Sequence, residues 1–167
     1  MLHLPTYDYL DKLNIPYAKA DFPTSIEKGA ASVARALGYH EHQMIKTLIF
    51  ETDAGECLLV MVGGDQNIVS GNLKKIAGSR NIKMADFETV KETTGYTVGS
   101  IPPFSWQPAD FRSFLDASLV TEPVLGVGTG VWGHEILITP KNLIKASGAH
   151  VVNLIDRERP ALLDQSG

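Results

Sequence analysis

The glycine-rich segment Gly126–Pro140, GVGTGVWGHEILITP, constrains the fold more than any other part of the chain. Gly128, Gly130 and Gly133 have the G-x-G-x-x-G spacing of dinucleotide-binding folds, in which the glycines follow a strand and open a helix. Here β-branched residues follow the glycines and Pro140 then prevents a helix from continuing. The segment therefore predicts a strand, a glycine-rich turn and a second strand, whose glycines allow a backbone to approach a ligand closely.

A second hairpin is indicated by two apolar runs on either side of a short turn. MIKTLIFE (44–51) and CLLVMVGG (57–64) are separated by TDAGE. Further strands are predicted at YAKADF, DFRSFLDASL and HVVNLID. Helices are predicted at 6–13, 26–39, 71–78, 85–95 and 140–148. Because strands dominate and some neighbour each other as hairpins, an α+β fold is favoured over a doubly wound sheet.

Helix ends are predicted from capping residues. Thr6, Ser70 and Thr139 precede or begin helical patterns, and Thr24 with Glu27 has the spacing of a capping box. Gly38 is expected to end the second helix and Pro140 to occupy the first turn of the last one.

Composition is that of an ordinary globular domain. The chain has 167 residues, 44% hydrophobic and 20% charged, with a net charge of −4 and one cysteine, Cys57. We expect a single domain over 1–156 and a mobile polar tail over 157–167. No membrane-length apolar run or signal-peptide pattern is evident, and a lone cysteine excludes an intrachain disulfide, so a cytoplasmic location is expected.

Mild acidity disfavours non-specific binding to nucleic acid, although one basic cluster is present. The cluster is either a solvated helix face with its following loop or a landing site for phosphates, and it consists of Lys74, Lys75, Arg80 and Lys83.

Lys46 lies within an apolar strand, where it would share a face with Leu48 and Phe50. Desolvating an unpaired ammonium is costly. Lys46 therefore either extends its amine to the rim of the sheet or lines a cavity that receives an anion or polar substrate.

Gly99-Ser100-Ile101-Pro102-Pro103 forms a stiff loop. Rigid backbone N–H groups in such a loop can stabilise a developing oxyanion. The sequence contains no H-E-x-x-H, G-x-S-x-G or Walker motif, and Cys57 is more typical of a core residue than of a nucleophile.

IKTLIF, VGGD, TGYTVGSIPPF and GTGVWGHEILITPKNLIKASGA occur in the order seen in the YbaK/EbsC family. This family comprises free-standing relatives of the editing domain of bacterial prolyl-tRNA synthetase, and the resemblance runs from about Leu10 to Ile155. It implies an editing-domain fold with a mixed, largely antiparallel, curved or barrel-like sheet flanked by short helices. The implied activity is metal-free hydrolysis, without a cofactor, of mischarged tRNA, typically Cys- or Ala-tRNA(Pro), assisted by the tRNA 2′-hydroxyl.

The resemblance also implies residue roles. Lys46 would be the essential lysine, and Gly99 to Pro103 the G-x-x-x-P loop that positions water and oxyanion. The remaining substrate-binding residues would be Phe22, Ile26, Thr47, Ser100, Ile101, Pro102, Gly128, Thr129 and Gly130. The basic cluster would contact tRNA. Prolyl-tRNA synthetase or an elongation factor are further expected partners.

Two departures leave alternatives open. Relatives often carry serine where this chain has Gly128, so the hydroxyl is lost or moved to Thr129, which on a strand points to the opposite face. Thr47 is typical of the cysteine-clearing branch, whereas the alanine-clearing branch usually has asparagine. Two alternatives stay open: a non-catalytic module that binds a tRNA end or a synthetase, and hydrolysis of a different small aminoacyl ester. Turnover that Lys46→Ala abolishes would favour an enzyme over the module, and without any turnover position 128 would be the first to restore to serine.

Overall fold

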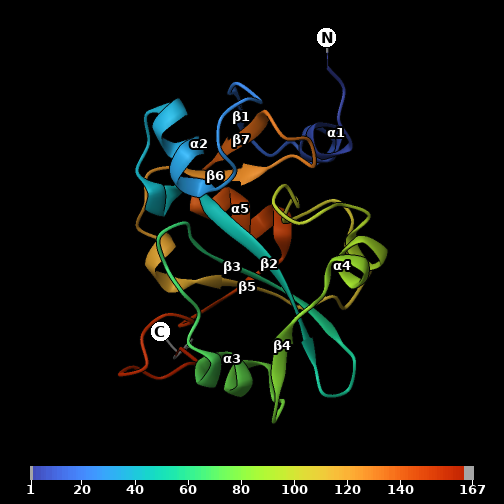
Figure 1. Cartoon of the computed structure of the whole chain (residues 1–167), viewed down its shortest axis with the longest axis vertical. Helices are drawn as coiled ribbons and strands as arrows, with labels where there is room; N and C mark the ends of the chain where they lie inside the picture. The colour runs from blue at the N-terminus through green and yellow to red at the C-terminus, as the bar shows by residue number, and fades with distance from the viewer. Residues whose placement is uncertain (1, 164–167) are drawn as a thin grey trace.

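The computed structural model describes residues 2–163 and contains two β-sheets. The smaller sheet has the order β1-β7-β6 and is antiparallel throughout; its strands are Ala18–Asp21 (β1), Leu125–Gly128 (β6) and His134–Ile138 (β7). It lies at one end of the molecule, above the larger sheet in Figure 1.

The larger sheet has the order β4-β2-β3-β5-β8 and is mixed. The first three strands pair antiparallel, and β5 and β8 join parallel. Its strands are Ile45–Thr52 (β2), Cys57–Gly63 (β3), Ile82–Met84 (β4), Ser113–Asp116 (β5) and His150–Val152 (β8). The predicted α+β class and both predicted hairpins are confirmed, with the curvature divided between two sheets rather than closed into one barrel.

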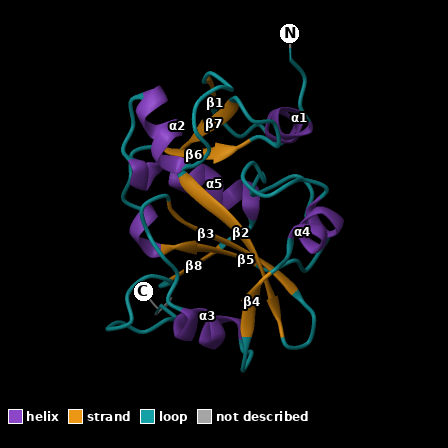
Figure 2. Cartoon of the chain, in the orientation of Figure 1, coloured by secondary structure: helices purple, strands orange, loops and turns teal. Residues whose placement is uncertain are grey.

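Five short helices surround the sheets (Figure 2). They are Pro5–Lys12 (α1), Ala30–Leu37 (α2), Ser70–Ala77 (α3), Phe87–Thr94 (α4) and Pro140–Ser147 (α5), with 3-10 turns at Glu41–Gln43 (η1) and Ala117–Leu119 (η2). No helix within residues 2–163 is long and apolar enough to cross a membrane.

Three of the four helix starts predicted from capping residues are wrong, including those at Thr6 and Ser70, and one is correct. Helix α1 begins at Pro5, and the Thr6 hydroxyl donates to the carbonyl of Thr129 at 3.2 Å instead of capping the helix. Ser70 lies inside α3, whose N-cap is Val69. Thr139 does cap α5, accepting from the Asn142 N–H.

The second helix is shorter than predicted. It begins at Ala30 because Gly29 adopts φ 123°, a conformation incompatible with helix. Thr24 and Glu27 therefore lie in a loop, which also carries Lys28. Gly38 ends the helix in the left-handed conformation, as predicted.

The β2-β3 hairpin lies between two apolar cores. Leu59 and Met61 of β3 pack into the larger core with residues of α1 and α5, whereas Val60 and Val62 pack into a second core with Leu73 of α3. This hairpin positions one wall of the site described below.

The first part of the predicted mobile tail is packed against the second core. Asn153 donates from its side-chain amide to the carbonyls of Arg159 and Pro160, and Ala161 is buried. Residues 164–167 of that predicted tail lie outside the described residues.

Candidate active site

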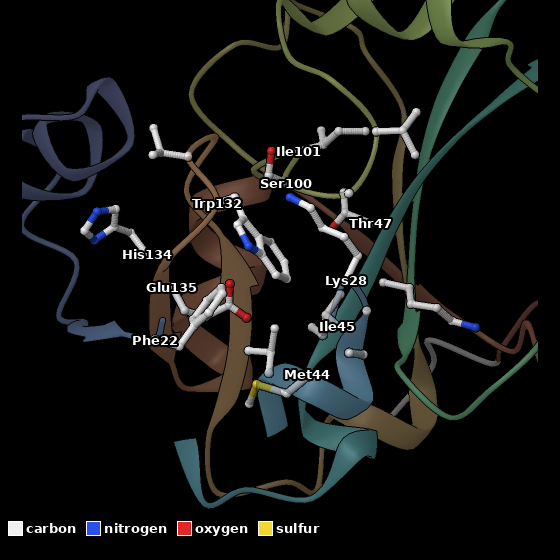
Figure 3. Close-up of a pocket in the computed structure, with 18 of the residues that line it drawn as sticks. Phe22, Lys28, Met44, Ile45, Thr47, Ser100, Ile101, Trp132, His134 and Glu135 are labelled. Carbon is white, nitrogen blue, oxygen red and sulfur yellow. The ribbon is translucent and has the colours of Figure 1, made fainter. Parts of the chain in front are cut away.

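A cavity of about 210 Å³ lies between the start of β2, the loop around Gly99 that follows α4, and the β6-β7 hairpin (Figure 3). β4 pairs with β2 only at residues 50–52, and no strand of the described chain pairs with Lys46, Thr47 or Leu48 on that side. This open edge forms one wall. The lining residues are Phe22, Lys28, Gly29, Ala30, Val33, Met44, Ile45, Lys46, Thr47, Leu48, Val98, Gly99, Ser100, Ile101, Gly128, Val131, Trp132, His134 and Glu135.

Lys46 and Thr47 both line the cavity but start from opposite faces of β2. Lys46 pairs with Val62, on the face toward α3, and Thr47 pairs with Met61, on the face toward the larger core. The half-buried Lys46 forms no ion pair or hydrogen bond with any residue between 2 and 163. Its ammonium is therefore available to a ligand.

The Thr47 hydroxyl is buried and has no hydrogen-bond partner among the described residues. Buried polar atoms in folded proteins are nearly always paired. In Figure 3 Thr47 stands on the β2 wall, across the cavity from Glu135. A bound ligand with a polar group would satisfy this oxygen.

The loop from Gly99 to Pro103 is held rigidly by its carbonyl groups. Ser100 O accepts from Gly130 N at 2.8 Å, Pro102 O from Trp106 Nε1 at 2.6 Å, and Pro103 O from a side-chain amide at 2.7 Å. Gly99 adopts φ 104°, which favours glycine.

The N–H groups of this loop are free by contrast. Within residues 2–163, the backbone N–H groups of Gly99, Ser100 and Ile101 donate to no protein acceptor. Fixed carbonyls with free neighbouring N–H groups make a preorganised set of donors for a developing oxyanion.

Gly128 lies directly against this loop. A Cβ atom there would stand 2.9 Å from the Ser100 oxygen and 3.0 Å from its carbonyl carbon. Serine at this position would therefore displace the loop. The serine that relatives often carry at this position therefore does not fit here unless the Gly99 loop shifts.

The Thr129 hydroxyl stabilises the hairpin turn instead of facing the cavity. It donates toward the carbonyls of Val131 and His134 at 3.1 and 3.0 Å, and accepts from the Val131 N–H. Thr129 is 1% exposed. The hydroxyl at this position is thus fully used by the protein itself.

Glu135 is the buried acid of the cavity. Its side chain points into the cavity beside Phe22 and Trp132 in Figure 3, and the residue is 9% exposed. Burial in these apolar surroundings raises the pKa of the Glu135 carboxyl to about 8.

An aromatic cluster closes the side of the cavity next to Glu135. Phe22 and Trp132 pack edge to face at 4.7 Å, and Trp132 Nε1 donates to Thr24 O at 3.1 Å. The Lys28 amine stands 4.0 Å from the centre of the Trp132 ring. Lys28 and Lys46 are thus two cations on the lining.

The structure brings together seven of the predicted site residues on this lining: Phe22, Lys46, Thr47, Gly99, Ser100, Ile101 and Gly128. The predicted residues outside the lining are Ile26, Pro102, Pro103, Thr129 and Gly130. Ile26 packs against the cluster that contains Phe22, and Pro102 and Pro103 are buried.

The basic cluster lies away from the cavity. Lys74 and Lys75 belong to α3, Arg80 follows it, and Lys83 lies on β4. These elements are at the end of the molecule opposite the smaller sheet (Figure 1). The basic cluster and the cavity are therefore separate parts of the surface.

Sequence reasoning missed Lys28, Trp132 and Glu135. Lys28 was assigned to a helix that does not form there, and Glu135 to a strand of ordinary alternation. The sequence signal that could have identified Glu135 is its place in the otherwise apolar strand pattern before Pro140. A carboxylate in such a strand is unusual, because carboxylates are rarely buried without a partner.

We predict that Glu135→Gln stabilises the protein, increasingly so as pH rises. The folded-state pKa of Glu135, about 8, lies above the ordinary value of 4.5, so the unfolded chain loses this proton at lower pH than the folded protein. The free energy of unfolding of the wild-type protein therefore decreases as the pH rises from about 4.5 to about 8. Glutamine removes that loss. The free energy of unfolding of Glu135→Gln should exceed that of the wild-type protein by at most about 3 kcal/mol at pH 7 and by less than about 1 kcal/mol at pH 5.

Urea unfolding of both proteins at pH 5, 6, 7 and 8 measures this difference. An advantage that does not change with pH would show that Glu135 titrates normally.

Among the described residues, no three His, Cys, Asp or Glu side chains are grouped so as to hold a metal ion. The sequence profile of the aminoacyl-tRNA editing domain matches residues 26–146. These residues include the whole β2 wall, the Gly99 loop and the β6-β7 hairpin.

Proline–tRNA ligases are among the relatives. The enzyme of Maridesulfovibrio salexigens is 37% identical over 90 residues, covering 54% of this chain and 15% of the ligase. That of Desulforamulus reducens is 28% identical over 115 residues, covering 69% and 20%. The chain thus spans about a fifth or less of the length of these relatives.

A solved structure described as a candidate trans-editing enzyme for prolyl tRNA synthetase superimposes with a TM-score of 0.82 at 25% identity, covering 93% of this chain and 99% of that one. The hypothetical protein APE2540 gives 0.82 at 25% identity, covering 91% and 99%. The predicted family is confirmed: the chain belongs to the aminoacyl-tRNA editing domain family, which includes YbaK and the prolyl-tRNA synthetase editing domain.

Proposed function

We propose that this protein acts in trans as an aminoacyl-tRNA deacylase, hydrolysing the ester of a mischarged proline tRNA that carries cysteine or alanine. The observation that carries the proposal is that one cavity is lined by Lys46, by Thr47 and by the Gly99 loop, whose N–H groups are free. The editing-domain family and its prolyl-tRNA relatives support it.

In the proposed reaction the aminoacyl ester of the terminal adenosine enters the cavity beside the Gly99 loop. Water attacks the ester carbonyl, oriented partly by the ribose 2′-hydroxyl, and the oxyanion accepts hydrogen bonds from the N–H groups of Gly99, Ser100 and Ile101. The bond to the ribose oxygen then breaks, and that oxygen takes a proton. The Lys46 ammonium faces the negative charge of the tRNA end or of the developing oxyanion.

The size of the cavity favours a small amino acid. Its volume of about 210 Å³ is below the roughly 300–1,000 Å³ typical of drug-sized ligand sites. Met44 and Val33 are buried in the wall. One methylene is worth about 1–3 kcal/mol in such a pocket, and the unpaired Thr47 hydroxyl favours a side chain with a polar atom, as in cysteine.

The test is deacylation of proline tRNA charged separately with Ala, Cys, Ser, Thr or Pro. We expect clearance of Cys or Ala well above spontaneous hydrolysis and no clearance of Pro. Binding of all five without clearance would instead identify a non-catalytic module.

The basic cluster is proposed to contact the tRNA body. Lys74→Glu combined with Lys75→Glu should raise KM, leave kcat unchanged and reduce the slope of log KM against log salt by about 1–2, because each phosphate contact contributes about one unit. Steady-state deacylation at several salt concentrations measures this. Lys141→Glu, an exposed lysine of α5, is the control; equal slopes in all three proteins would exclude the contact.

Prolyl-tRNA synthetase is the proposed protein partner, and an elongation factor stays a prediction. A cytoplasmic location is likewise proposed from the role in translation.

A further inference from the structure

Glu135 has a place in the cavity that the proposed reaction leaves unexplained. It is 9% exposed and points into the cavity beside Phe22 and Trp132 (Figure 3). No group within residues 2–163 forms an ion pair or a hydrogen bond with its carboxyl. Burying a carboxyl group without a partner destabilises the folded protein, and a bound group that pairs with the carboxyl offsets this cost.

The charges around Glu135 identify what it can bind. Among the lining residues it is the only acid. The two lysines of the lining do not pair with it: Lys28 lies over the Trp132 ring, and Lys46 starts from the far face of β2. His134 lines the cavity too, but its Nδ1 is 2.7 Å from the Asp21 carboxylate.

Every unblocked aminoacyl ester carries an ammonium group on its α-carbon. Enclosing that cation in a mostly apolar cavity is unfavourable unless an anion meets it. Glu135 is the one lining residue that can supply an anion, and it lies across the cavity from the Thr47 hydroxyl. The geometry thus separates two polar positions, one for the α-ammonium and one for the side chain.

We propose that Glu135 determines substrate specificity by binding the α-ammonium of the aminoacyl group, so that the site accepts unblocked aminoacyl esters and rejects esters whose α-nitrogen is acylated or absent. This inference rests on the proposed deacylase function. It adds a substrate class: aminoacyl-tRNA is cleaved, whereas peptidyl-tRNA and N-formylated aminoacyl-tRNA are spared.

The proton balance of this step is simple. In the free protein the raised pKa keeps the Glu135 carboxyl largely protonated at pH 7. When the ammonium arrives, the carboxyl proton passes to solvent, and a carboxylate and an ammonium remain in contact. No bond to carbon changes in this step.

The test compares alanyl-tRNA with lactyl-tRNA, in which a hydroxyl replaces the α-amino group with almost no change in size, and cysteinyl-tRNA with its α-hydroxy analogue. Each kcat/KM is divided by the spontaneous hydrolysis rate of the same ester. The wild-type protein should prefer the amino ester by about 10- to 100-fold, the range expected for a hydrogen bond to a charged group. Glu135→Gln should reduce this preference to less than about threefold by slowing only the amino ester.

Two further variants exclude a merely structural effect. Glu135→Asp should keep part of the preference, and Glu92→Gln, at an exposed position of α4, should keep all of it. A lost cavity would instead lower the rates for both esters together.

The outcomes separate the two proposals. Equal wild-type rates for amino and hydroxy esters, with both cleared, would overturn the role of Glu135 and leave the deacylase intact. The same preference in Glu135→Gln as in the wild-type protein would do likewise. A wild-type protein that clears none of the esters would overturn the deacylase function, and with it this inference.

Discussion

Replacing Gly128 by alanine or serine is expected to lower kcat/KM for ester hydrolysis by about 10²-fold, the effect of misplacing catalytic groups by about 1 Å. The added Cβ would lie 2.9 Å from the Ser100 oxygen, and all three of its nearest atoms, in Ser100 and Ile101, belong to the backbone. The Gly99 loop must therefore shift, together with its N–H donors. Deacylation kinetics of the purified variants provide the measurement.

A matched control for this substitution is Gly71→Ala. Gly71 lies in α3 with nothing near its added Cβ, so alanine there should leave the activity unchanged. Higher activity in Gly128→Ser than in the wild type would show that a serine hydroxyl is missing from this site and that the loop tolerates it.

Removing the Lys46 ammonium is expected to have a comparable or larger effect. Lys46→Ala should lower kcat by about 10²–10³-fold, the usual result of removing one electrostatic group that stabilises a transition state. The melting temperature should change little, because Lys46 makes no hydrogen bond or ion pair within the described residues.

Lys83→Ala is the matched control for Lys46→Ala. Lys83 has a 75% exposed side chain and lies near Glu51 at the far end of β2, so its loss should not affect kcat. A Lys46→Ala protein with wild-type kcat would place the essential charge elsewhere, with Lys28 as the next lysine to replace.

The two hairpins could be predicted from sequence because their signals are local. Two apolar runs on either side of a short turn define β2 and β3, and Pro140 separates β7 from α5. The existence of two sheets could not be predicted in this way. It depends on β1 pairing with β7, whose residues are more than 110 positions away, and no local pattern encodes that contact.

The site was predictable where function requires an unusual residue in a regular element. Lys46 in an apolar strand and the stiff loop after Gly99 are both of this kind. Lys28 was not predictable, because the φ angle of Gly29 delays the start of α2 to Ala30 and leaves Lys28 in the preceding loop. Glu135 was missed because alternation alone places it on the outer face of β7, which other segments cover in the folded chain.

The measurement that tests the central claim most directly is single-turnover deacylation of Cys-tRNA(Pro) and Ala-tRNA(Pro), with the protein in excess over tRNA. Single turnover reports ester cleavage without the contribution of product release. We predict first-order loss of at least one of the two esters, at least about 10²-fold faster than its spontaneous hydrolysis, the contribution of a single preorganised group. Loss of both esters at the spontaneous rate, in a protein that binds the charged tRNA, would contradict the account.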